Sequence, residues 1–146
     1  MGTKDEGAAL VEFAVLAPLL LLLLLGIVEF GWLFAQFNEV RHSAQEGARW
    51  GAVSRPDVDG VAGLDWGDMT ARACNAADLP SATTISVDAT LGGGQKGDTA
   101  SNTVTANVQS LTSAPFISSF LPAQLTNTAT FRLEQDATWT PAPTNC

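Results

Sequence analysis

The stretch GAALVEFAVLAPLLLLLLLGIVEFGW, residues 7–32, decides the fold of the first part of the chain. The sixteen residues from Phe13 to Val28 carry no charge, and as an α-helix they extend about 24 Å, slightly less than the hydrocarbon core of a bilayer. Aromatic residues continue the apolar segment to Phe37, which makes it long enough to span. We therefore predict that residues 8–37 contact membrane lipid.

The flanks of this segment separate a retained anchor from a cleaved secretory signal. Lys4 is the one basic side chain before the apolar run, acidic residues follow it directly, and no A-x-A triplet occurs before the bulky aromatic residues. A Sec-type signal has a positively charged start and a small-residue cleavage site, so the sequence favours an anchor. Lys4 and Arg41 lie on opposite flanks, which leaves the positive-inside bias too weak to orient the segment.

Glu12 places a carboxylate just inside the apolar run. A cut after Gly7 would leave a free ammonium on Ala8, four residues before Glu12 on the same helical face, where the two charges offset each other. In an assembly, Glu12 could instead pair with the ammonium of a neighbouring subunit and set the axial register, because an unpaired charge in an apolar bundle is costly. An interfacial position at the membrane edge explains Glu12 equally well, so these interpretations stay open.

Residues 7–13, GAALVEF, resemble the cleavage motif of class III signal peptides in Tad/Flp-type pilins, and residues 7–31 are similar to the start of TadE-like minor pilins. This resemblance implies cleavage by a prepilin peptidase between Gly7 and Ala8. It also implies that Glu12 and Phe13 act in assembly and register. Phe13 departs from the Tyr that many Flp major pilins carry there. The implied orientation has the leader inside and the C-terminal domain outside the cytoplasmic membrane.

The predicted fold class is α+β, with a leader at 1–7, a transmembrane and stalk helix at 8–52, and an extracytoplasmic domain at 53–146. From Glu29 onward the helix becomes amphipathic, and we expect its second half to pack on the chain's own C-terminal domain. The expected contact stripe comprises Trp32, Phe37, Val40, Ala44 and Ala48, while Glu29, Gln36, Glu39, Glu46 and Arg49 are expected largely elsewhere.

The C-terminal part predicts a short helix at 66–78, capped by Asp65, followed by a three-stranded antiparallel sheet. Each strand alternates apolar and polar residues, as expected for a sheet with one solvated face. The end of the third strand, residues 125–135, is again similar to the closing strand of TadE-like proteins. The predicted inward residues are Ile85, Val87, Ala89 and Leu91; Val104, Ala106 and Val108; and Leu125, Ala129, Phe131 and Leu133.

An apolar segment with two prolines, LTSAPFISSFLPAQ at 111–124, separates the second and third strands. Two interpretations stay open. The segment covers one end of the core, or its large apolar side chains form an exposed partner-binding patch. The residues in question are Phe116, Ile117, Phe120 and Leu121.

Cys74 and Cys146 lie in the part that the resemblance places outside the cytoplasm. In an oxidising compartment an even pair most simply forms a disulfide, which here would close a loop of about 70 residues. Two free thiols are the less favoured alternative.

Four acidic residues invite a calcium interpretation, since hard cations take several oxygen ligands. Their spacing does not match an EF-hand, and caps and turns explain each one separately, so we predict no metal site and keep calcium as the minor alternative. These residues are Asp57, Asp59, Asp65 and Asp68. No zinc-ligand spacing occurs.

Catalytic motifs are missing from the sequence. His42 is the one histidine, no G-x-S-x-G occurs, and Lys96 is followed by Gly where a phosphate loop needs Ser or Thr. A net charge of −8 argues against nucleic acid, whose phosphates need a basic surface. We therefore predict no enzyme and no cofactor.

The predicted function is that of a pilin-like structural subunit in the cytoplasmic membrane and the surface pilus. Its expected partners are prepilin peptidase, other pilin subunits and the Tad assembly platform. The alternative is a permanently membrane-anchored surface or secretion accessory protein that enters no filament.

Overall fold

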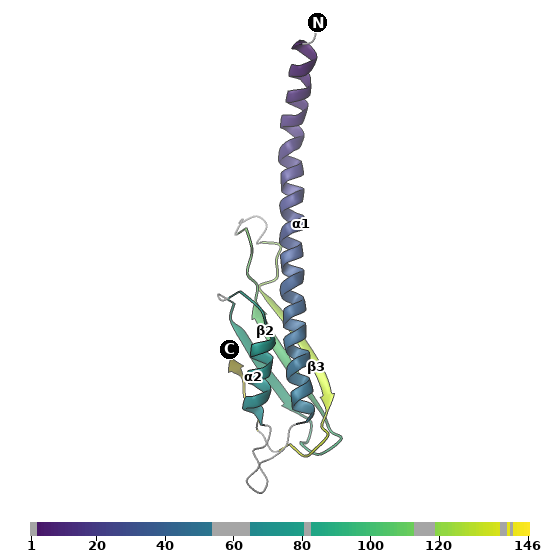
Figure 1. Cartoon of the computed structure of the whole chain (residues 1–146), viewed down its shortest axis with the longest axis vertical. Helices are drawn as coiled ribbons and strands as arrows, with labels where there is room; N and C mark the ends of the chain where they lie inside the picture. The colour runs from purple at the N-terminus through teal and green to yellow at the C-terminus, as the bar shows by residue number, and fades with distance from the viewer. Residues whose placement is uncertain (1–2, 54–64, 81–82, 113–118, 138–139, 141) are drawn as a thin grey trace. The chain divides into compact units, whose positions relative to one another are not determined.

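The computed structural model describes residues 3–53, 65–80, 83–112, 119–137, 140 and 142–146. The chain divides into two compact units, which are described separately. Unit 1 comprises Met1–Phe34 and Ser110–Leu121, and unit 2 comprises Ala35–Gln109 and Pro122–Cys146. Helix α1, Thr3–Ala52, contributes residues to both units. The predicted combination of a long apolar helix, a short helix and an antiparallel sheet is confirmed (Figure 1).

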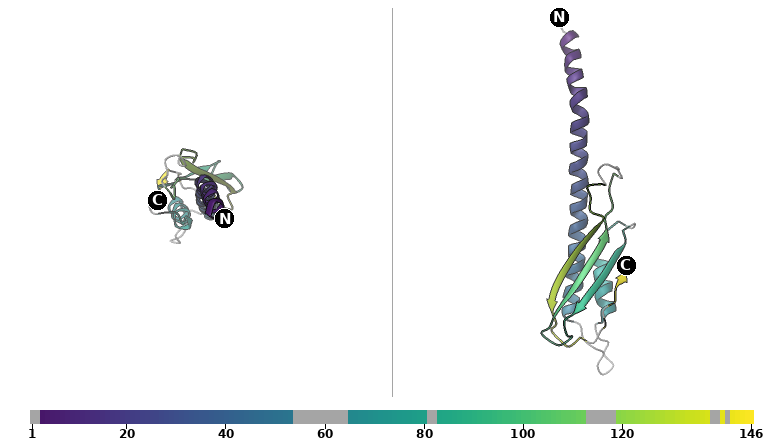
Figure 2. Two further views of the ribbon diagram at one scale, coloured as in Figure 1. Left: turned by 90° about the horizontal axis from the view of Figure 1, so that it is seen from above. Right: turned by 180° about the vertical axis from the view of Figure 1, so that it is seen from behind.

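Unit 2 has two layers, with helices on one face of an antiparallel sheet. Helix α2, Trp66–Ala76, and the second half of α1 cover the same face (Figure 2). The sheet has the strand order β3-β2-β1-β4, with every neighbouring pair antiparallel. Its strands are β1, Ile85–Leu91; β2, Thr99–Asn107; β3, Gln124–Arg132; and β4, Thr144–Asn145.

The three predicted strands are confirmed, and β4 is an addition. A strand of two residues is too short to show period-two alternation, so the sequence did not predict it. On the polar face, threonine hydroxyls pair across strands, with Oγ1–Oγ1 distances of 2.9 Å for Thr103–Thr128 and 3.1 Å for Thr105–Thr126. Such cross-strand pairs stabilise the observed register.

Helix α2 confirms Asp65 as its N-cap. The Asp65 carboxylate accepts a hydrogen bond from the Asp68 backbone N–H, and the Asp68 carboxylate accepts one from the Asp65 N–H, both at 3.1 Å. This reciprocal capping box satisfies donors that the first helical turn leaves unpaired. The helix ends at Ala76, two residues before the predicted end, because Ala77 is already extended with φ −86° and ψ 99°.

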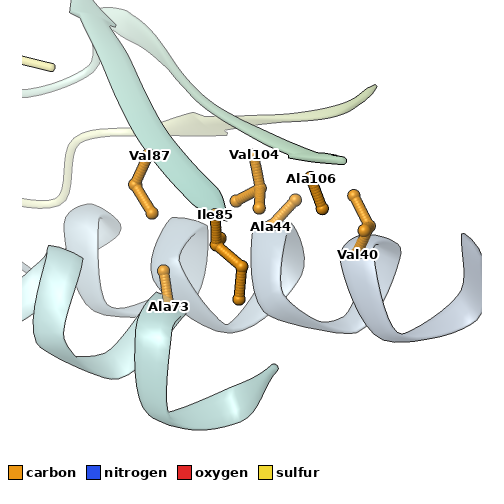
Figure 3. Close-up of a cluster of buried hydrophobic side chains, with 7 residues drawn as sticks. All are labelled: Val40, Ala44, Ala73, Ile85, Val87, Val104 and Ala106. Carbon is orange, nitrogen blue, oxygen red and sulfur yellow. The ribbon is translucent and has the colours of Figure 1, made fainter. Parts of the chain in front are cut away.

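The core of unit 2 lies between the helices and the sheet. One cluster joins small side chains of both helices to branched side chains of the central strands (Figure 3). It comprises Val40, Ala44, Ala73, Ile85, Val87, Val104 and Ala106. A second cluster comprises Met69, Ala89, Ala100, Leu133 and Ala137.

Glycines on α1 allow it to approach this core closely. A Cβ added at Gly47 would overlap the Asn102 side chain and lie 3.0 Å from Ala73 Cβ, and one added at Gly51 would lie 2.7 Å from Met69 Sδ. The expectation that the second half of the helix packs on its own C-terminal domain is therefore confirmed.

The buried stripe of α1 differs from the prediction at two polar residues. Glu29 and Gln36, expected largely outside the stripe, are 1% and 3% exposed within their respective units. In unit 2, Gln36 Nε2 donates to the Gln109 carbonyl at 2.9 Å, and Gln36 Oε1 accepts from the Gln109 N–H at 3.0 Å. Burial is tolerated because hydrogen bonds replace water at these groups, which a hydrophobic pattern alone does not reveal.

Candidate functional site

The candidate site in unit 1 begins with the exposed apolar surface of α1. This helix is long and apolar enough to cross a membrane, and no residue of its most apolar 18-residue stretch is buried. A contiguous apolar surface of this size marks contact with a membrane or with other protein. The large exposed side chains are Leu10, Val11, Phe13, Val15, Leu16, Leu19, Leu20, Leu21, Leu22, Leu23, Leu24, Leu25, Ile27, Val28, Phe30 and Phe34.

The structure places the four residues of the predicted processing and register site on α1. A Cβ added at Gly7 would meet nothing within 4 Å, Ala8 and Glu12 are exposed, and Phe13 is 65% exposed. Ala8 and Glu12 are four residues apart in one helix and therefore share a face. Cleavage after Gly7 and the register role of Glu12 and Phe13 stay predictions.

Glu29 forms a polar contact that sequence reasoning did not predict. Its carboxylate accepts hydrogen bonds from the backbone N–H of Leu111 at 2.9 Å, from the N–H of Thr112 at 3.1 Å and from Thr112 Oγ1 at 3.0 Å. The Ser110 side chain adds a further hydrogen bond. Three consecutive residues thus converge on one carboxylate, and all of them belong to unit 1.

These hydrogen bonds give acceptors to the backbone N–H groups of Leu111 and Thr112 and give donors to the Glu29 carboxylate. Hydrogen bonds to an ionised acceptor are stronger than those between neutral groups, and the two backbone N–H groups receive acceptors outside any helix or sheet ladder. The sequence signal was weak, because Glu29 and Leu111 are 82 residues apart. The only local indication is the acid that ends the uncharged run after Val28.

The described residues of Ser110–Leu121 also expose apolar side chains. Leu111 is 52% exposed and Phe120 is 81% exposed, whereas Leu121 is half-buried. The exposure of Phe120 agrees with the interpretation of this segment as a partner-binding patch. Phe116 and Ile117, which the same prediction included, lie outside the described residues.

In unit 2, the sulfur atoms of Cys74 and Cys146 lie 2.00 Å apart, at disulfide distance. Cys74 lies on α2, and the Cys146 N–H donates to the Ile85 carbonyl at 2.9 Å. Trp66 Nε1 also donates to Thr144 Oγ1 at 3.3 Å. The predicted cysteine pair is therefore brought together, and backbone pairing holds the same tail at the edge of β1.

Of the remaining polar candidates, the structure describes Asp65, Asp68 and His42. Asp65 and Asp68 are engaged in the capping box, whereas Asp57 and Asp59 lie outside the described residues. Within the described part of the chain, no three His, Cys, Asp or Glu residues are grouped so that they could hold a metal ion. His42 is exposed on α1.

Comparison with protein families gives one match, which covers residues 7–49 and is described as TadE-like protein. The matched residues all lie on α1, and the match begins at Gly7, the residue before the predicted cut. The predicted resemblance to TadE-like proteins is confirmed for this part of the chain. Comparisons with curated proteins and with solved structures found no match.

Proposed function

We propose that this chain is a pilin-like structural subunit of a Tad/Flp-type pilus, held in the cytoplasmic membrane by α1 and assembled into the filament or at its tip, where it serves surface attachment. One observation carries this proposal: the TadE-like match begins on the same part of α1 whose apolar side chains are exposed. Such a helix needs an apolar environment from outside the chain.

Covering the apolar surface of α1 contributes a large favourable free energy. Full burial of one large apolar side chain is worth about 1.5–3 kcal/mol, so the run from Leu10 to Phe34 represents tens of kcal/mol. A bilayer supplies this environment before assembly, and neighbouring helices supply it in a filament. A subunit can therefore pass from one to the other with its apolar surface covered in both.

Maturation in this proposal removes residues 1–7. Prepilin peptidase cuts between Gly7 and Ala8, and the new ammonium of Ala8 pairs with Glu12 of a neighbouring subunit, with Phe13 beside it. The domain at 53–146 lies outside the cytoplasm, and the partners are other pilin subunits and the Tad assembly platform.

Shearing of surface filaments from cells that produce the chain tests this function. We expect the mature protein in the sheared fraction together with other pilins, while an integral membrane marker stays with the cells. Recovery of all mature protein with the membrane marker would instead establish the permanently anchored accessory protein.

A Glu12→Ala variant tests the register role. We expect normal membrane insertion, since the variant removes a charge from an apolar segment, but reduced incorporation into filaments that also contain wild-type subunits. Glu46→Ala is the matched control, because Glu46 forms a surface ion pair at 3.5 Å with Arg49, and such pairs contribute little to stability. Equal incorporation of both variants at equal expression would make Glu12 merely interfacial.

A further inference from the structure

We infer that Leu111 and Phe120 form a second membrane contact, which lies in the boundary between headgroups and acyl chains of the leaflet where α1 leaves the bilayer. The inference rests on the proposed insertion of α1. Both residues belong to unit 1, together with the apolar part of α1, and Leu111 is bound through its N–H to Glu29 of that helix.

The charge pattern of α1 locates this boundary near Glu29, and the exposed Phe30 and Phe34 that follow lie in the same interfacial region. The 21 residues from Ala8 to Val28 extend about 31 Å as a helix, which equals the thickness of a typical hydrocarbon core. Glu29 is the first charged residue after this span, and it is the residue to which Leu111 and Thr112 bind. The hydrogen bonds to Glu29 thus hold Leu111 at the level of the membrane surface.

Those hydrogen bonds also lower the cost of placing the backbone of Leu111 and Thr112 near the hydrocarbon. A loop near hydrocarbon must satisfy its backbone N–H groups within the protein, because water is scarce there. The Glu29 carboxylate accepts from both N–H groups and from the Thr112 hydroxyl, and it is itself 1% exposed. These polar atoms therefore bind one another, while the apolar side chains of Leu111 and Phe120 are exposed.

Side-chain chemistry selects lipid as the partner. Ser110–Leu121 contains no charged residue, so none of its own side chains carries a charge into the boundary between headgroups and acyl chains. Phe and Leu are the side chains that interfacial segments insert below the headgroups. Exposure of 81% for Phe120 leaves that ring available for such contact.

Spin labels on single added cysteines test the inference in the full chain. The native cysteines are paired with each other at disulfide distance, so Leu111→Cys, Phe120→Cys, Leu19→Cys and Thr128→Cys each provide one labelling site. The proteins are reconstituted in vesicles of equal parts phosphatidylcholine and phosphatidylglycerol. Depth is read from the accessibility of each nitroxide to oxygen relative to a water-soluble nickel chelate.

We expect the oxygen-to-nickel ratio at positions 111 and 120 to be several-fold higher than at Thr128, which is exposed on the polar face of the sheet, and lower than at Leu19 near the middle of the span. Ratios at both positions equal to the Thr128 value, with a deep label at Leu19, would overturn the inference and leave the membrane anchor intact. An oxygen-to-nickel ratio at Leu19 as low as the ratio at Thr128 would overturn the proposed insertion of α1 itself.

Discussion

Two residues of α1 show how single positions hold each unit together. Gly47 leaves space for Asn102, which is fully buried on β2 and donates from Nδ2 to the Ala44 carbonyl at 3.0 Å. Glu29 places a carboxylate where three consecutive residues donate to it. In both cases burial of a polar group is tolerated because it is hydrogen-bonded, and the partner lies far away in the sequence.

A Gly47→Ala variant should destabilise unit 2. Alanine favours a helix by about 1 kcal/mol over glycine, but the added methyl group displaces Asn102 and presses on Ala73, and overpacking costs about 1–3 kcal/mol. Net destabilisation of about 1 kcal/mol would lower Tm by roughly 4–8 °C in thermal unfolding of the full chain in detergent.

Gly31→Ala is the matched control for this variant, because a Cβ added at Gly31 meets nothing within 4 Å. Its Tm should equal or exceed that of the wild type. Equal Tm values for both variants would show that Asn102 moves without cost.

A Glu29→Gln variant should release Leu111 and Thr112. The neutral amide offers one acceptor oxygen where the carboxylate offers two, so at least one backbone N–H loses its partner. We expect faster amide hydrogen exchange at Leu111 and Thr112, measured by mass spectrometry. Glu46→Gln is the control and should leave this exchange unchanged; unchanged exchange in both variants would contradict the assigned role of Glu29.

At the level of elements, the last strand and the cysteine pair act on the same segment. Strand β4 has only two residues, yet it pairs with Ser86 and Val87 of β1, and Cys146 follows it directly. Two paired residues alone give a strand little stability, and Cys146 lies at disulfide distance from Cys74 of α2. A bond between these cysteines would hold the tail that covers the edge of β1.

Cys146→Ser should lower the Tm of unit 2, and Cys74→Ser should have the same effect. A disulfide across a sequence separation of 72 residues contributes on the order of 4 kcal/mol through chain entropy, less any strain in the folded state. The double variant should be no less stable than either single variant, because each removes the same bond.

The measurement for these variants uses the full chain, since Val40 and Ala44 of α1 belong to the core of unit 2. Non-reducing peptide mapping of exported protein gives the independent check. Free thiols at both cysteines would refute the covalent tether.

At the level of the whole molecule, α1 contributes to both units with different parts of its length and different chemistry. Its first part exposes a continuous apolar surface in unit 1, and its second part contributes small side chains to the core of unit 2. The TadE-like match at 7–49 covers both parts. Removal of the leader, residues 1–7, should therefore shorten α1 only at its exposed N-terminal end.

Intact-mass measurement of protein exported by cells with an active prepilin peptidase should give a chain that begins at Ala8. A Gly7→Leu variant should keep residues 1–7, because the side chain blocks recognition of the cut site while α1 has space for it. Expression without the peptidase is the control and should give the uncut chain. Retention of the leader in the wild type with active peptidase would exclude the class III interpretation.

The sequence by itself determined the apolar helix, the capped α2, the three long strands and the cysteine pair. Each of these depends on local pattern or on the only pairing available: an uncharged run, Asp65 followed by Asp68, period-two alternation, and two cysteines in one chain. The tertiary structure decided the roles of Glu29, Gln36 and Asn102 and the presence of β4. Hydrogen bonds between residues 58 to 83 positions apart determine these polar contacts, and no hydrophobic periodicity encodes their partners.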